Sequence, residues 1–286
     1  MHYDPVKYTL AKLLRGRILR RAFHLGLDMI FLRAWYVRKE LKRIADSGLR
    51  IAESRLASPK SKIRILDAGM GFGQYSDRMA RLFKGAKITG LEIDKAHLYG
   101  GEEYFRAVHP GFNFAIGDVQ ILPFKANSFD LIVTVDVMEH IPDDRATFAE
   151  YARVLRPGGR LLMHTPRDRT EKGKGKREGG DHEHWDVGEH VRDGYRDADA
   201  KKKIEAAGLT VEHVVRGYGK PGMVAWTLLQ RFPMTWLGWS KAMIPVVAFY
   251  LVVVLPVAVV AMAIDRAPGD REDGGSLMIS AVKKQS

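Results

Sequence analysis

The feature that most constrains this chain is a regular alternation of short apolar runs with amphipathic stretches between residues 63 and 164. The apolar runs predict strands, and the amphipathic stretches have helical spacing. Strands that alternate with helices form a parallel sheet covered on both faces, and such sheets bind ligands at the carboxyl ends of their strands. The predicted strands are 63–66, 87–92, 112–116, 129–135, 160–164, 209–215 and 276–282, with helices at 75–83, 95–108, 145–155 and 195–207.

A glycine-rich segment, Leu66–Gly73, lies between the first predicted strand and the first predicted helix. Glycines there let the backbone approach a ligand closely, and the N-terminus of the next helix favours polar or anionic groups. The spacing does not complete the dinucleotide fingerprint because Gln74 occupies the last glycine position, which argues against an NAD enzyme. No Gly-Lys-Ser/Thr follows the glycines, so the segment is not a phosphate-binding P-loop.

Carboxylates follow the next three predicted strands. Glu92 ends the second strand, about 20 residues after the glycines, where it can accept bonds from both hydroxyls of a ribose. Asp118 follows the third strand, where a carboxylate can accept a bond from an adenine amino group. Asp136 follows the fourth strand, in the run Val135–Ile141. These signals together predict a nucleoside-containing ligand more strongly than the glycines alone.

With these motifs, the sequence resembles the class I S-adenosylmethionine-dependent methyltransferases, in particular the branch that includes quinone-biosynthesis enzymes. The resemblance covers roughly residues 60–217 and resumes at 276–283. It implies an α/β fold with a Rossmann-like, mostly parallel sheet of seven strands, whose antiparallel last strand lies beside the fifth. It also implies S-adenosyl-L-methionine as cofactor. By the family pattern, the methionine end of the cofactor would be lined by Asp67, Gly69, Gly71 and Gly73. Glu92 would hold the ribose, and Asp118 and Val119 would contact the adenine. Asp136 would also bind the cofactor, at the start of the segment that faces cofactor and substrate.

Methyl transfer from a sulfonium is an in-line displacement, and the protein supplies positioning and a dry site. A base is needed only if the acceptor must lose a proton, and the candidates are His140, His182 and His184. The cluster 181–186 could also bind a divalent metal, but its spacing matches no standard site, so no metal is predicted. A solvated polar loop is the alternative for most of these side chains. His164 falls inside the fifth predicted strand and is interpreted as a core histidine.

An apolar insert separates the sixth and seventh predicted strands. Residues 242–264 carry no charge, and Trp226, Trp236 and Trp239 precede them, as at a membrane interface. Because the two strands are neighbours in the family, the insert must return to the side of the membrane that it left. We expect a hairpin with helical legs 225–239 and 242–264, bent at Pro256. The alternative is a soluble lid or dimer surface.

The net charge of +12 is concentrated near the N-terminus. Residues 1–62 contain 15 Lys and Arg against 5 Asp and Glu, and residues 6–44 have helical spacing. This basic arm, expected to lie outside the catalytic core, suits either an anionic membrane surface or a solvated face that packs on the core. The chain has no cysteine, which excludes disulfides and thiolate chemistry. No apolar secretory signal is recognised at the N-terminus.

The predicted organisation is a basic arm (1–60), a methyltransferase core (61–220), a membrane-associating insert (221–270) and the last core strand (271–286). The predicted function is methyl transfer at the cytoplasmic face of the membrane to an apolar small-molecule or lipid-linked acceptor. The alternatives are an RNA methyltransferase that uses the basic arm, and a homologue that binds the cofactor without catalysis. Nucleic acid is not the expected partner, because the basic residues are distant in sequence from the site and an apolar insert has no use in RNA binding.

Overall fold

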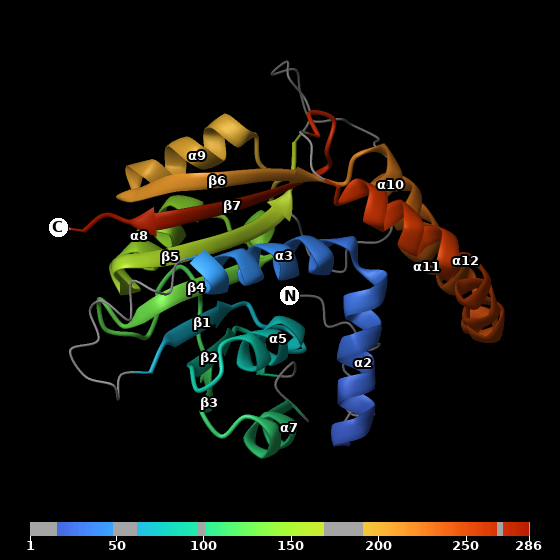
Figure 1. Ribbon diagram of the computed structural model, residues 1–286, viewed down its shortest axis with the longest axis horizontal. Helices are drawn as coiled ribbons and strands as arrows, with labels where there is room; N and C mark the ends of the chain where they lie inside the picture. The colour runs from blue at the N-terminus through green and yellow to red at the C-terminus, as the bar shows by residue number, and fades with distance from the viewer. Residues whose placement is uncertain (1–15, 48–61, 96–100, 169–190, 268–270, 286) are drawn as a thin grey trace.

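The computed structural model describes residues 16–47, 62–95, 101–168, 191–267 and 271–285. Its centre is a seven-stranded sheet of order β3-β2-β1-β4-β5-β7-β6 (Figure 1). The strands are β1 (Arg64–Ala68), β2 (Lys87–Glu92), β3 (Phe112–Ile116), β4 (Phe129–Val135), β5 (Leu155–Pro166), β6 (Leu209–Gly217) and β7 (Ser276–Lys283). The fold prediction is therefore confirmed, including the position of the last strand beside the fifth.

Strand direction changes at β7. The first five strands pair in parallel, whereas β7 is antiparallel to both β5 and β6. Gly217, the last residue of β6, is the register partner of Ser276, the first residue of β7. The chain therefore leaves the sheet and returns to it at the same position along the strands.

Helices cover both faces of the sheet. The helices α5 (Gln74–Leu82) and α7 (Gly101–Val108) pack on one face with residues of the N-terminal arm. On the other face, α8 (Asp144–Val154) and α9 (Asp197–Ala206) pack against a second apolar cluster. Consecutive residues of a strand point to opposite faces, so Leu162 joins the first cluster and Met163 the second.

The arm forms two helices, α2 (Arg17–Ile30) and α3 (Leu32–Ser47), separated by a break at Phe31. In α3, Val37, Leu41 and Ile44 are fully or almost fully buried. Their spacing of four and three residues places them on one side of the helix, which packs on the sheet. This part of the arm therefore belongs to the hydrophobic core.

The insert folds as a helical hairpin that projects from one end of the sheet (Figure 1). Its first leg contains α10 (Lys220–Trp226), a π-helical turn (Thr227–Arg231) and α11 (Phe232–Trp239), and its second leg is α12 (Ile244–Asp265). The π-turn lies just before Pro233, which has no N–H to continue the regular bonding. The chain reverses at Ser240, whose backbone is extended, between the two predicted legs. The bend expected at Pro256 does not interrupt the second leg, because α12 is continuous through this proline.

A buried carboxylate joins the two ends of the hairpin. Asp265, at the end of α12, is 1% exposed and accepts bonds from the backbone N–H groups of Tyr218 (3.0 Å) and Gly222 (3.1 Å). The Tyr36 hydroxyl of α3 donates to the same side chain at 2.7 Å. The hairpin is thus fixed both to itself and to the arm.

Candidate active site

The glycine segment forms a tight loop between β1 and α5. Gly69, Gly71 and Gly73 have φ angles of +81°, +50° and +80°, which glycine adopts at no steric cost. The Gly71 N–H donates to Glu92 Oε2 at 2.9 Å, so the loop is tied to the end of β2. A Cβ built on Gly71 would meet nothing within 4 Å, which indicates open space beside the loop.

The side chains around this space fit S-adenosylmethionine. Glu92 and Asp118 place carboxylate acceptors beyond β2 and β3, as hydroxyls and an amine require, and Val119 is a buried apolar neighbour. Asp67 is fully buried and accepts a bond from the Ser76 hydroxyl at 2.5 Å. Burial raises the pKa of Asp67 to about 7, the Ser76 bond opposing the shift. The assignment of these residues and of the loop glycines to the cofactor stays a prediction that the donor set supports.

The arm lies against the glycine loop, closer than expected of a separate segment. In α2, His24 Nε2 is 3.0 Å from the carbonyl oxygen of Phe72, and the ring of Phe23 meets that of Phe72 edge-on. Asp28 accepts a bond from the Gln74 amide at 2.7 Å. The arm therefore helps to form the wall of the site, which the sequence did not reveal because these contacts join residues about 50 positions apart.

Asp136 lies in a cluster of polar side chains beyond the end of β4. Its Oδ2 pairs with Arg33 Nη1 of α3 at 2.9 Å, and its Oδ1 lies 2.7 Å from His164 Nδ1 of β5. Burial would raise the pKa of Asp136, but Arg33 and then His164 lower it, to about 2. Burial would likewise lower the pKa of Arg33, but Asp136 and the Tyr75 and Tyr218 hydroxyls hold it above its usual range. Both partners of the pair are therefore ionised.

Glu139, in contrast to Asp136, is a mostly neutral carboxyl group. It is 2% exposed, and Oε2 accepts a bond from the Thr165 hydroxyl at 3.1 Å. Burial and the neighbouring Asp136 raise the pKa of Glu139 to about 8, so this carboxyl is mostly protonated at neutral pH. The segment after β4 thus presents one anionic and one neutral carboxyl group.

Four members of this cluster were missed as site residues: Arg33, Tyr75, Tyr218 and His164. His164 is buried, as its interpretation as a core histidine requires, but its Nδ1 bonds Asp136 and its Nε2 has no partner among the described residues. The fourth and fifth predicted strands are neighbours, and the pairing of Val135 with His164 could have indicated this contact. No local signal placed Arg33 here.

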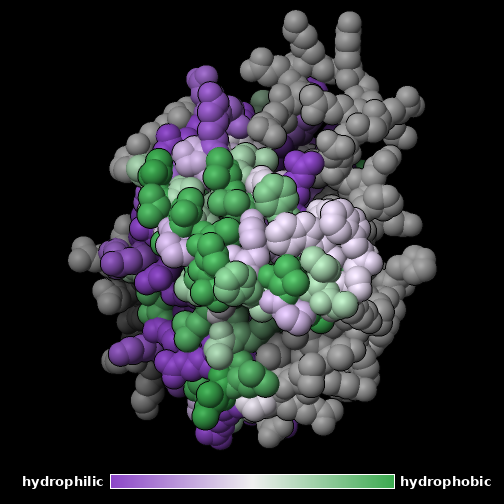
Figure 2. Space-filling view, turned by 90° about the vertical axis from the view of Figure 1, so that its right-hand side faces the viewer, coloured by the Kyte–Doolittle hydropathy of each residue, from purple (hydrophilic) through white to green (hydrophobic). Residues whose placement is uncertain are grey.

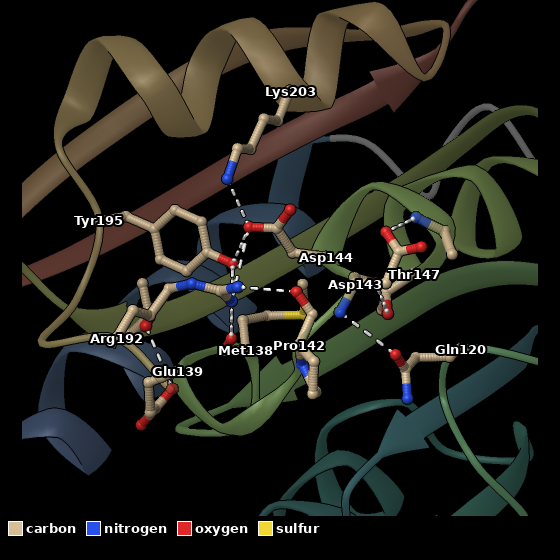
Figure 3. A network of polar contacts seen from close by, with 12 residues as sticks. Gln120, Met138, Glu139, Pro142, Asp143, Asp144, Thr147, Arg192, Tyr195 and Lys203 are labelled. Carbon is tan, nitrogen blue, oxygen red and sulfur yellow. Dashed lines mark hydrogen bonds and ion pairs between the residues drawn. The ribbon is translucent and has the colours of Figure 1, made fainter. Parts of the chain in front are cut away.

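The backbone that carries Glu139 and His140 is fixed from the other side of the sheet (Figure 3). Arg192 donates to the carbonyl oxygens of Met138 (2.6 Å) and Pro142 (3.2 Å). Beside it, Asp144 accepts bonds from the Tyr195 hydroxyl (2.8 Å) and the Lys203 ammonium (2.6 Å). This network connects α8 and α9 to the short 3-10 turn Met138–His140 and limits its movement.

One of the three predicted catalytic histidines lies within the described residues. His140 is exposed on the 3-10 turn. His182 and His184 lie outside the described residues. Among the described ranges, no group of three or more His, Asp or Glu side chains could hold a metal ion.

Comparison with known proteins decides the family. A family model described as "Methyltransferase domain" matches residues 66–163, from β1 to β5. These residues form a class I S-adenosylmethionine-dependent methyltransferase domain. The match includes the glycine loop, Glu92, Asp118 and Asp136.

Two curated relatives match the methyltransferase domain at similar levels. The chain is 31% identical over 137 residues to the ubiquinone biosynthesis O-methyltransferase of Nitrosococcus oceani, covering 46% of this chain and 56% of that protein. It is 36% identical over 110 residues to the fatty-acid O-methyltransferase of Mycolicibacterium smegmatis, covering 38% and 39%. The chain thus spans about half the length of these relatives or less.

Solved structures share the fold at low identity. Phosphoethanolamine N-methyltransferase 2 of Haemonchus contortus, in complex with S-adenosyl-L-methionine, has a TM-score of 0.52 and 18% identity over 92% of this chain and 60% of that one. The [4+2]-cyclase SpnF has a TM-score of 0.53 and 21% identity, over 86% and 81%. A protein named as a cyclase has the same fold, so the fold alone does not specify methyl transfer.

Proposed function

We propose that this protein transfers a methyl group from S-adenosylmethionine to an apolar or lipid-linked acceptor at the cytoplasmic face of a membrane. The methyltransferase domain and the fitting donor set support the reaction. The names of the two curated relatives refer to a quinone and a fatty acid, which are apolar small molecules.

The observation that carries the membrane part of the proposal is the exposed apolar hairpin. Among the described residues, α12 is the one helix that is long and apolar enough to cross a membrane. Phe249 and Val252 are 74% and 72% exposed, and Trp239 near the tip is 75% exposed. Hydrophobic side chains gather on the face that carries the hairpin (Figure 2). A contiguous apolar surface of this kind marks a membrane or protein contact.

The topology favours a hairpin that dips into the bilayer over a single crossing. Asp265 and Tyr218 are hydrogen-bonded, so the first leg begins and the second leg ends beside the sheet. The base of the hairpin, where Asp265 lies, would be at the level of the headgroups. Exposed apolar residues of α2, such as Ile18 and Leu25, would add to this contact.

The protein's part in catalysis is to orient the reactants and exclude water. S-adenosylmethionine supplies, when bound, a methyl group on a positively charged sulfur. The glycine loop and Glu92 would hold the nucleoside end, and α2 covers the loop. Asp136 lies at the end of β4, facing the proposed acceptor side. Positioning of this kind lowers the barrier by reducing the entropy lost in reaching the reactive geometry.

Label transfer to a lipid extract tests the reaction. The purified chain is incubated with methyl-labelled S-adenosylmethionine and lipids of the host, and the labelled species are analysed by mass. Label in a lipid-soluble small molecule is the expected result. Label only in RNA would support the alternative methyltransferase, and cofactor binding without any label would support a homologue without catalysis.

Vesicle flotation tests the location separately. We expect the protein to float with vesicles of anionic and zwitterionic phospholipids and to fractionate with membranes. Recovery in the soluble fraction without detergent, with no flotation, would leave a lid or dimer surface as the role of the hairpin.

A further inference from the structure

We propose that Arg33 binds the headgroup of the methyl acceptor, and that this headgroup is the carboxylate of a single-chain amphiphile. The inference rests on the proposed function and specifies its substrate class. It assigns to Arg33 a binding role in addition to its ion pair with Asp136.

Arg33 has unused capacity for a second anion. A guanidinium carries five N–H donors, and the ion pair with Asp136 is made through Nη1. The side chain is 29% exposed, so it is not sealed within the protein. Its Cζ also lies over the ring of Phe31, 4.2 Å from the ring centre, and this cation–π contact helps to position the guanidinium. An oriented, partly open guanidinium is suited to the two oxygens of a carboxylate.

Backbone strain is concentrated around this arginine. Among the described residues other than glycine, three have positive φ: Asn127, Asp136 and Tyr218. Two of them contact Arg33, since Asp136 pairs with its side chain and the Tyr218 hydroxyl accepts its backbone N–H at 3.1 Å. Unfavourable backbone angles persist where the surrounding structure holds them, and they cluster at functional sites.

Arg33 lies where a lipid headgroup would be. Tyr218 connects the backbone of Arg33 to Asp265, which ends the long apolar helix. With the hairpin inserted in a bilayer, this base of the hairpin is at the level of the headgroups. A single-chain amphiphile in the same leaflet would then have its polar end beside Arg33 and its tail along the hairpin.

The neighbouring charges permit an anion. Glu139 is mostly protonated at neutral pH and adds no second negative charge to that of Asp136. His140 and His164 stand near Asp136 as further polar groups. A carboxylate would therefore face a guanidinium without strong repulsion from a second carboxylate.

The reaction on a carboxylate balances without a base. One carboxylate oxygen forms a bond to the methyl carbon while the carbon–sulfur bond breaks, and the bonding electron pair remains on sulfur. The anionic oxygen and the positive sulfur both become neutral, and no proton is transferred.

The test compares a carboxylate with a neutral lipid of equal length. Wild-type protein is assayed on vesicles containing palmitate or hexadecanol, with labelled S-adenosylmethionine. The variants are Arg33→Gln, Arg33→Lys and Arg38→Gln. Arg38 is an exposed residue of the same helix and provides the matched loss of charge. Melting temperature and binding of S-adenosylhomocysteine report folding of each variant.

We expect methylation of palmitate and not of hexadecanol. Loss of hydrogen bonds to a charged group should raise KM for palmitate about tenfold or more in Arg33→Gln. Arg33→Lys should be intermediate, and Arg38→Gln should resemble wild type. If Arg33→Gln fails to fold, the comparison of Arg33→Lys with Arg38→Gln decides.

Several results would overturn the inference. Equal activity on the two lipids, or an unchanged KM for palmitate in folded Arg33 variants, would exclude carboxylate binding by Arg33. Label in another lipid of the host extract but not in palmitate would sink the inference and leave the proposed function standing. Absence of label from every lipid would reject both.

Discussion

At the scale of single residues, the site depends on backbone angles and protonation states that the surrounding fold imposes. The glycine loop reverses direction at positive φ, and Glu139 is held mostly neutral by burial and by Asp136. Each of these features can be changed by one substitution, and each has a separate readout.

The loop prediction concerns Gly71. Gly71→Ala should raise the dissociation constant of S-adenosylhomocysteine at least tenfold, because its methyl group would enter the open space beside Glu92. Positive φ at alanine should also cost about 1 kcal/mol of stability. Gly85→Ala is the control: Gly85 has φ +82° and open surroundings, but lies at the end of α5 away from the site. Calorimetric titration with equal weakening in both variants would contradict the assignment.

The second prediction concerns Glu139→Gln. In the unfolded chain this carboxyl ionises near its ordinary pKa, whereas in the folded protein it ionises at about pH 8. Between these values the unfolded state releases the proton more readily, so wild-type stability falls as pH rises. The variant lacks this loss and should gain on the order of 3.5 kcal/mol relative to wild type from pH 5 to pH 8. Urea unfolding at several pH values measures it, and a pH-independent difference would refute the protonation state.

The residues of the site were predictable only in part. The glycines and the strand-end carboxylates can be recognised in the sequence, because each lies directly after a predicted strand. Arg33 and His24 could not be found this way, because their partners are distant in sequence and the packing of α2 and α3 brings them together.

At the scale of elements, the hairpin depends on its base. Asp265 accepts bonds from Tyr36 of α3 and from two backbone N–H groups at the start of the insert. A buried carboxylate that loses a donor is not compensated by water. The contact between the hairpin and the arm should therefore be sensitive to Tyr36.

The third prediction is that Tyr36→Phe costs about 1.5–3 kcal/mol, because it removes a hydrogen bond to a buried charged group. Tyr151→Phe is a matched change: Tyr151 is also buried, but its hydroxyl makes a long 3.4 Å contact with Thr134. It should cost less than 1 kcal/mol. Equilibrium unfolding in urea checks both, and equal losses would show that Asp265 does not depend on Tyr36.

Elements were easier to predict than the contacts between them. The core strands and helices were recovered because periodicity reports burial within a single element. The reversal at Ser240 falls between the two predicted legs, 225–239 and 242–264, whereas the expected bend at Pro256 does not interrupt α12. The apolar residues Val37, Leu41 and Ile44 indicate which face of α3 is buried. The sequence does not indicate that this face packs on the sheet, which only the structure shows.

At the scale of the whole molecule, the proposed function places catalysis and membrane contact in different regions. The methyltransferase domain occupies residues 66–163, and the exposed apolar surface lies on the hairpin and α2. A change on the hairpin should therefore affect location without removing the cofactor site.

The fourth prediction is that Phe249→Asp with Val253→Asp abolishes vesicle flotation. The two residues lie one turn apart on α12 and are 74% and 58% exposed. Each aspartate costs about 3 kcal/mol at the centre of a membrane helix. Binding of S-adenosylhomocysteine should be unchanged, and Val108→Asp, on the exposed part of α7, should float like wild type. Unaltered flotation of the double variant would place the membrane contact elsewhere.

The pairing of Gly217 with Ser276 has a consequence for how such a protein can diversify. Because the chain leaves and re-enters the sheet at paired residues, the segment between Gly217 and Ser276 can be replaced without shifting the register of the seven strands. A replacement segment must still supply an acceptor for the backbone N–H of Arg33, which the Tyr218 hydroxyl provides here. Within that condition, exchange of this one segment could change the surface that the proposed function assigns to the membrane, while the strand ends beside the proposed cofactor site stay the same.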